Sequence, residues 1–232
     1  PDLVITEPKH ALARPASRRS GNWGKLHSSA SETLPALKAL FSSAQKSIWI
    51  ETFNFGNDAM GQQIYPILIA KAKAGVEVKV VADYVGSRFI KGHADMAKKL
   101  RAAGVDFRLY KPRFIQKDDK RRGINILHRK LYMVDGERAL CGGVNLMAHF
   151  ESHTQDVLVE WQGPIVDDLA HEWAFDWKAA GGRAVTFGPP QPAVPGGSVE
   201  ARVVVTSPAE GRYEGRDAIY AAIEGARHEI RI

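Results

Sequence analysis

The sequence has 232 residues, of which 44% are hydrophobic, and a formal net charge of +6. This length allows one large α/β domain, or one domain and part of another. The single cysteine, Cys141, excludes an intramolecular disulfide framework, and no apolar run reaches the length of a transmembrane helix. The excess of positive charge favours an anionic partner: nucleic acid, phospholipid headgroups or a phosphorylated metabolite.

Helices and strands are predicted to alternate along most of the chain. Residues 1–30 are polar and are expected to form an N-terminal arm with at most one short strand. Beyond this arm, apolar periodicity and capping residues predict a regular order of elements. These are a helix over 31–44, a strand over 46–53, a helix over 58–73, a strand over 76–84, a helix over 93–104, strands over 105–110, 130–134, 138–141 and 156–161, and a helix after Pro164. Such alternation predicts an α/β sandwich.

Residues 111–126 are predicted to form a charged loop, in which six cations stand against Asp118 and Asp119. Two interpretations remain open. The loop is either a solvated surface segment or a basic rim beside a site for an anionic substrate.

Domain boundaries are indicated by composition and by a short repeat. Residues 31–180 are expected to form the first domain and the Gly- and Pro-rich residues 181–198 a linker. The stretch Glu224–Ile232 resembles Ser42–Ile50 at an offset of 182 residues, and similar helices precede both. We therefore expect residues 199–232 to begin a second, truncated domain related to the first.

Candidate catalytic residues lie in the stretch "HRKLYMVDGERALCGGVN", which holds His128, Lys130, Asp135, Gly143 and Asn145. In a strand, His128 and Lys130 would share a face. A neutral imidazole can attack phosphorus, while a lysine and an asparagine amide can bind phosphate oxygens. Glycines allow a close backbone approach.

This stretch resembles the HKD motif of the phospholipase D superfamily, HxK-x4-D-x6-G-[SG]-x-N, and matches it at every fixed position. The flanking residues 50–87 and 154–177 resemble bacterial cardiolipin synthases. The resemblance implies a phospholipase D-like α/β/α sandwich with a mixed β-sheet flanked by helices. It also implies chemistry without a metal or another cofactor.

The resemblance further implies a role for each matched residue. His128 would be the nucleophile or the general acid, and Lys130, Asn145 and Gly143 would bind the substrate phosphate. Asp135 would support the site, and Asp156 would orient a histidine. Gly143 stands where a serine is often found, so a hydroxyl donor is missing there.

The function implied is a phosphatidyltransferase or phospholipase D that acts through a phosphohistidine on phospholipid phosphodiesters. A complete site needs a second HKD motif, supplied by a C-terminal region beyond residue 232 or by a second chain; the repeat near Val199 favours the former. The alternatives are an HKD-type nuclease, for which nucleic acid is the less favoured partner, and an inactive single-motif fragment that binds phosphate. We expect a cytoplasmic location, with peripheral membrane contact as a further option and no visible anchor.

Overall fold

The structure is a computed structural model that describes residues 18–111, 113–116, 122–147 and 156–231. The chain divides into two compact units. The larger contains Arg19–Pro112 and Ile126–Ala201, and the smaller includes Arg113–Asn125 and Arg202–Ile232. The candidate motif lies in the larger unit.

The larger unit is built on an eight-stranded mixed sheet in the order β10-β1-β9-β8-β7-β2-β3-β4. Strands β2, β3 and β4 run parallel, and the other neighbouring pairs are antiparallel. The strands are β1 (Arg19–His27), β2 (Ser47–Thr52), β3 (Glu77–Asp83), β4 (Asp106–Tyr110), β7 (Leu131–Val134), β8 (Arg138–Gly142), β9 (Leu158–Gln162) and β10 (Val199–Ala201).

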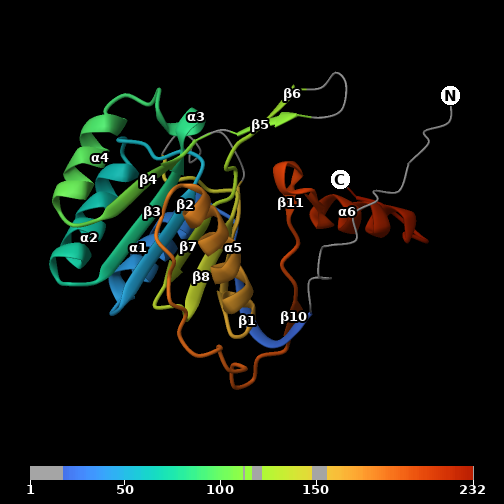
Figure 1. The fold of residues 1–232 in the computed structure, drawn as a ribbon. Coiled ribbons are helices and arrows are strands. Elements are labelled where there is room, and N and C mark those ends of the chain that lie inside the picture. Colours follow the sequence, from blue (N-terminus) through green and yellow to red (C-terminus); the bar gives the residue numbers. More distant parts are fainter. Residues whose placement is uncertain (1–17, 112, 117–121, 148–155, 232) are drawn as a thin grey trace. The chain divides into compact units, whose positions relative to one another are not determined.

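Helices cover both faces of this sheet (Figure 1). On one face lie α1 (Ala30–Ser43), α2 (Gly61–Lys73) and α4 (His93–Ala102), whose buried leucines pack with Ile48, Ile50 and Val80. On the other face lies α5 (Ile165–Ala179), where Trp173 stacks on Trp49 with ring centroids 4.7 Å apart. Successive residues of β2 point to opposite faces, so one strand contributes to both cores. The short helix α3 (Tyr84–Ser87) follows β3 directly.

This architecture confirms the predicted α/β/α sandwich, and the predicted elements of this unit agree with the observed ones to within about three residues. Two differences concern the edge of the sheet. Residues 19–27, expected in an arm, form the nine-residue strand β1, which pairs with β9. Residues 199–201, expected to begin the second domain, form β10, which pairs with β1. For residues 1–30 at most one short strand was expected, and none was expected at 199–201, because polar residues and glycines interrupt the hydrophobic pattern in both places.

The smaller unit holds the hairpin β5 (Arg113–Gln116) and β6 (Arg122–Asn125), where a loop was expected. It also holds β11 (Thr206–Ser207), the 3₁₀ turn η2 (Pro208–Glu210), β12 (Arg212–Tyr213) and α6 (Glu214–Glu224). Within the described residues, none of the helices combines the length and the apolar character that crossing a bilayer requires.

Candidate active site

The candidate site lies at the edge of the sheet where β2 and β3 end and β7 begins. Glu51, near the end of β2, pairs with Leu131, the first residue of β7. Residues 126–130, which include His128 and Lys130, precede β7 and lie outside regular secondary structure. The prediction that β7 begins at Lys130 is therefore one residue early, and the alternation of a strand does not by itself set the direction of His128.

Lys130 is a buried cation whose side chain is only 5% exposed. Its Nζ donates a hydrogen bond to the carbonyl oxygen of His128 at 2.6 Å and lies 5.4 Å from the centre of the Phe53 ring. Burial lowers the pKa of Lys130 to about 8, and the negative charges of Asp156 and Asp83 oppose a larger fall. Lys130 is thus positively charged at neutral pH, with donors left for a phosphate oxygen.

His128, in contrast, is exposed at the surface. Its ring lies against that of Phe53, with centroids 4.6 Å apart. Partial burial lowers the pKa of His128, the positive charge of Lys130 lowers it further, and Asp83 raises it. A lowered pKa makes the neutral imidazole the main form at pH 7, as a nucleophile for phosphorus requires.

Asn145 is buried, and its orientation is set by its neighbours. Its Oδ1 accepts hydrogen bonds from the backbone N–H of Asn54 at 3.0 Å and the Thr52 hydroxyl at 3.4 Å. Since a backbone N–H can only donate, this network assigns the oxygen to that side and the Nδ2 donor to the other. The hydrogen bonds thus fix which end of the Asn145 amide is the donor.

Gly143 and Asp156 lie in direct contact. A Cβ at position 143 would lie 1.7 Å from Asp156 Oδ1, so this glycine leaves the space that the carboxylate occupies. The Asp156 charge raises the pKa of Lys130, which places it electrostatically beside the predicted phosphate-binding cation. The charge that raises the pKa of His128 in this chain is that of Asp83. That Asp156 orients a histidine stays a prediction.

Asp135 does not join the other motif residues. It lies at the far end of β7, in a left-handed backbone conformation with φ of 57°. Its carboxylate accepts hydrogen bonds from the backbone N–H groups of Gln45, Lys46 and Ser47, at 2.7 to 3.2 Å. Asp135 thus holds the start of β2 in place, and the length of β7 separates it from His128. That Asp135 supports the catalytic site stays a prediction.

Asp83 is a site residue that sequence reasoning missed. It is fully buried at the end of β3, and its Oδ2 accepts a hydrogen bond from the backbone N–H of Leu127 at 2.8 Å. Its Oδ1 accepts one from the N–H of Gly86 and so caps α3. An aspartate directly after a buried parallel strand was the available signal, because ligands of such sheets bind at the carboxyl ends of the strands.

A second buried acid, Glu51, lies on the α5 face of β2. Within the described residues no hydrogen-bond donor reaches either of its carboxylate oxygens. Burial raises the pKa of Glu51 well above its usual value, and the negative charge of Asp176 raises it further. Both effects favour the protonated form of Glu51.

Arg129, between the two candidate catalytic residues, is bound to α5 at the same place. Its guanidinium forms ion pairs with Asp176 and, at 3.6 Å, with Glu172. This anchor directs the side chain of Arg129 toward α5. The backbone next to His128 is therefore held from two directions, by Asp83 at Leu127 and by α5 at Arg129.

The arrangement provides an exposed neutral imidazole, a buried ammonium group and an oriented amide. These groups suit attack on a phosphodiester and binding of the oxygens on which charge develops. No group of three or more potential metal ligands occurs in the part of the chain that the structure describes.

Comparison with known proteins gives the family. Residues 37–177 match the family model described as "Cardiolipin synthase, PLD-like domain". The chain belongs to this cardiolipin synthase family of phospholipase D-like domains.

Two curated members of the family illustrate the similarity. Cardiolipin synthase B of Escherichia coli K12 is 34% identical over 158 residues, which are 66% of this chain and 38% of the relative. Cardiolipin synthase of Clostridium perfringens SM101 is 28% identical over 203 residues, 82% of this chain and 42% of the relative. The chain thus spans about two fifths of the length of these relatives.

Solved structures with the same fold include two smaller proteins. Nuc from Salmonella typhimurium, described as a phospholipase D family member, aligns with a TM-score of 0.56 at 19% identity, over 71% of this chain and 99% of that one. NucT from Helicobacter pylori aligns with a TM-score of 0.54 at 16% identity, over 68% and 95%. These likenesses agree with the mixed sheet flanked by helices.

The pKa of Lys130 predicts how phosphodiester binding depends on pH. Dimethyl phosphate keeps one negative charge throughout, so its affinity should fall as the pH rises through about 8, where Lys130 loses its proton. The Lys130→Arg variant stays charged and should still bind dimethyl phosphate at about pH 9. The affinities are measured by ³¹P NMR titration. The exposed Lys98→Gln is the matched control. Equal affinity of the wild type at about pH 7 and about pH 9 would exclude Lys130 as the binding cation.

Glu51 predicts a pH-dependent stability. Since its pKa is raised in the folded state, its favourable contribution is complete below the unfolded-state pKa and is lost as the pH rises toward the folded-state value. Glu51→Gln cannot ionise, so its melting temperature relative to the wild type should increase from about pH 4 to about pH 8. Thermal unfolding at a series of pH values measures this. The exposed Glu137→Gln should show a flat difference, and a flat difference for Glu51→Gln would contradict the assignment.

Proposed function

We propose that this chain supplies one half of the active site of a phosphatidyltransferase of the phospholipase D type, with phospholipid phosphodiesters as substrates. One observation carries the proposal. An exposed imidazole of lowered pKa, at His128, lies beside the buried ammonium group of Lys130 in a domain of the cardiolipin synthase family. The relatives named cardiolipin synthase support the choice of a lipid substrate.

The proposed reaction has two displacements. In the first, a nitrogen of His128 attacks phosphorus, a P–N bond forms, and the P–O bond to the first alcohol breaks. A general acid from the other half of the site gives that alcohol its proton. In the second, the hydroxyl group of another lipid, or water, displaces His128. Lys130 Nζ and the amide of Asn145 bind the phosphoryl oxygens in both steps, and His128 exchanges roles with the acid if the other half provides the nucleophile.

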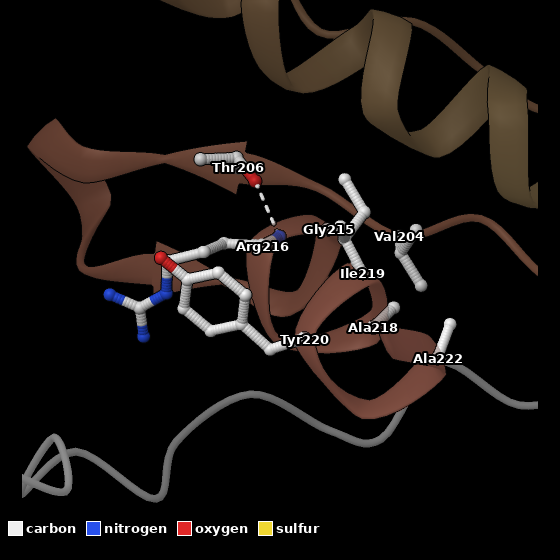
Figure 2. Close-up of a pocket in the computed structure, with 8 residues that line it drawn as sticks. All are labelled: Val204, Thr206, Gly215, Arg216, Ala218, Ile219, Tyr220 and Ala222. Carbon is white, nitrogen blue, oxygen red and sulfur yellow. Dashed lines mark hydrogen bonds between the residues drawn. The ribbon is translucent and has the colours of Figure 1, made fainter. Parts of the chain in front are cut away.

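The second half of the site is proposed to belong to a second domain that begins with residues 202–232, which are part of the smaller unit. At the offset of 182 residues, Ile219 and Ile223 of α6 correspond to Leu37 and Phe41 of α1. The α1 residues are fully buried, whereas Ile219 is 61% exposed. Figure 2 shows Ile219 beside Val204 in an apolar groove, continued along the helix by Ala218 and Ala222. The apolar positions that are buried in α1 are therefore exposed in α6. This supports a role for α6 as the first helix of a second sandwich.

A second chain that supplies an identical motif is the alternative source of this half. We propose a cytoplasmic location with peripheral contact to a membrane, because a phosphatidyl group must be taken from a bilayer. Nuclease activity on the same scaffold is the competing function.

The proposal is tested on a protein that contains this chain. With radiolabelled phosphatidylglycerol, transfer of the phosphatidyl group to a lipid hydroxyl is expected, and His128→Ala should reduce it by at least roughly 10²-fold, since no other group can take the role of the imidazole. Cleavage of single-stranded DNA is measured in parallel.

His171→Ala, which removes an exposed histidine of α5, is the matched control and should leave transfer unchanged. DNA cleavage without lipid transfer would replace the proposed function by the nuclease. Transfer that survives His128→Ala would exclude His128 from the reaction.

A further inference from the structure

The turn after β3 exposes apolar side chains at the edge of the sheet that carries the candidate site. Phe89 is 75% exposed, more than any other large apolar side chain among the described residues, and Val85 on α3 is 40% exposed. Exposing a phenylalanine to water is unfavourable relative to burying it. An exposed apolar surface of this kind beside a site is typical of contact with a partner.

The same turn is positively charged. The stretch "YVGSRFIKG" (Tyr84–Gly92) contains Arg88 and Lys91 and no acidic residue. The guanidinium of Arg88 lies 4.1 Å from the centre of the Phe89 ring and donates a hydrogen bond to the Tyr84 hydroxyl at 3.1 Å. Cations that flank an exposed aromatic ring suit binding to a bilayer, which has an apolar interior and anionic headgroups at its surface.

Three contacts attach this turn to the candidate site. Asp83 binds the N–H of Gly86 and also the N–H of Leu127, the residue before His128. The Ser87 hydroxyl donates to the carbonyl oxygen of Phe53, whose ring contacts that of His128. A Cβ at Gly86 would lie 2.6 Å from the same carbonyl oxygen, so only glycine permits this close packing. These contacts fix the turn relative to the segment that carries His128; Figure 1 shows α3 directly after β3.

We propose that the turn Tyr84–Lys91 is a membrane-contact element that binds the surface of an anionic phospholipid bilayer. Phe89 and Val85 enter the headgroup region, while Arg88 and Lys91 contact the lipid phosphates. The attachment through Asp83 and Ser87 then brings His128 to the level of the headgroups. This inference rests on the proposed phospholipid substrate, and it adds the residues that bring the site to that substrate.

Vesicle sedimentation tests the element directly. With vesicles of phosphatidylglycerol and phosphatidylcholine, Phe89→Ser should weaken binding by about tenfold or more, because the burial of one aromatic side chain is lost. The matched control is Phe175→Ser, which removes a 43% exposed phenylalanine from α5 and should bind as the wild type does. The double variant Arg88→Gln and Lys91→Gln should weaken binding to phosphatidylglycerol vesicles while leaving weak binding to pure phosphatidylcholine unchanged. Thermal unfolding verifies that each variant is folded.

Absence of wild-type binding to the anionic vesicles, or equal binding of wild type and Phe89→Ser, would overturn the inference. So would a loss of single-stranded DNA binding in Phe89→Ser with vesicle binding intact, since Phe89 would then be a base-stacking residue.

Binding needs no turnover, which separates the two proposals. If lipid transfer is absent but binding depends on Phe89, the proposed function fails and the membrane contact stands. If transfer is present but binding is independent of Phe89, the membrane contact alone fails.

Discussion

The candidate site depends on buried carboxylates that hold a segment lacking regular secondary structure. Residues 126–130 precede β7, so the sheet does not fix the backbone at His128. Asp83 binds the N–H of Leu127 on one side, and Asp176 pairs with Arg129 on the other. Both carboxylates belong to elements of the folded core. The position of an exposed histidine is thus set by groups behind it, which the packed sandwich keeps in place.

Carboxyl groups around Lys130 also set the charge of the site. Burial alone would favour a neutral Lys130, and the surrounding negative charges keep its pKa near 8. Burial raises the pKa of Glu51, and the charge of Asp176 raises it further, so the protonated form of Glu51 is favoured. The result is a positive Lys130 next to a neutral His128 at pH 7. This is the combination that binding and attack on a phosphodiester require.

The sequence predicted the α/β/α sandwich because local hydrophobic periodicity shows the alternation of helices and strands. It predicted the motif because the motif is a local spacing of residues. It placed His128, Lys130, Gly143 and Asn145 in one site, and the structure brings these residues to one edge of the sheet. The spacing along β7 did not show that the Asp135 carboxylate binds the backbone of residues 45–47, because those residues are far from it in the sequence. Asp83 lies 44 positions before Leu127, and only the pairing of distant strands brings the two together. The full length of strand β1 was not predicted because its pairing with β9, rather than its composition, makes it a strand.

We propose that the charge of Asp83, rather than that of Asp135, controls the pH dependence of the candidate site. The most direct measurement compares dimethyl phosphate affinity against pH, and the unfolding midpoint, for Asp83→Asn and Asp135→Asn. Asp83→Asn removes a charge that raises the pKa of Lys130. The variant should therefore lose dimethyl phosphate binding at a lower pH than the wild type does. Asp135→Asn should lower the unfolding midpoint and keep the wild-type pH dependence of binding. A shift in that pH dependence with Asp135→Asn, and none with Asp83→Asn, would contradict the account.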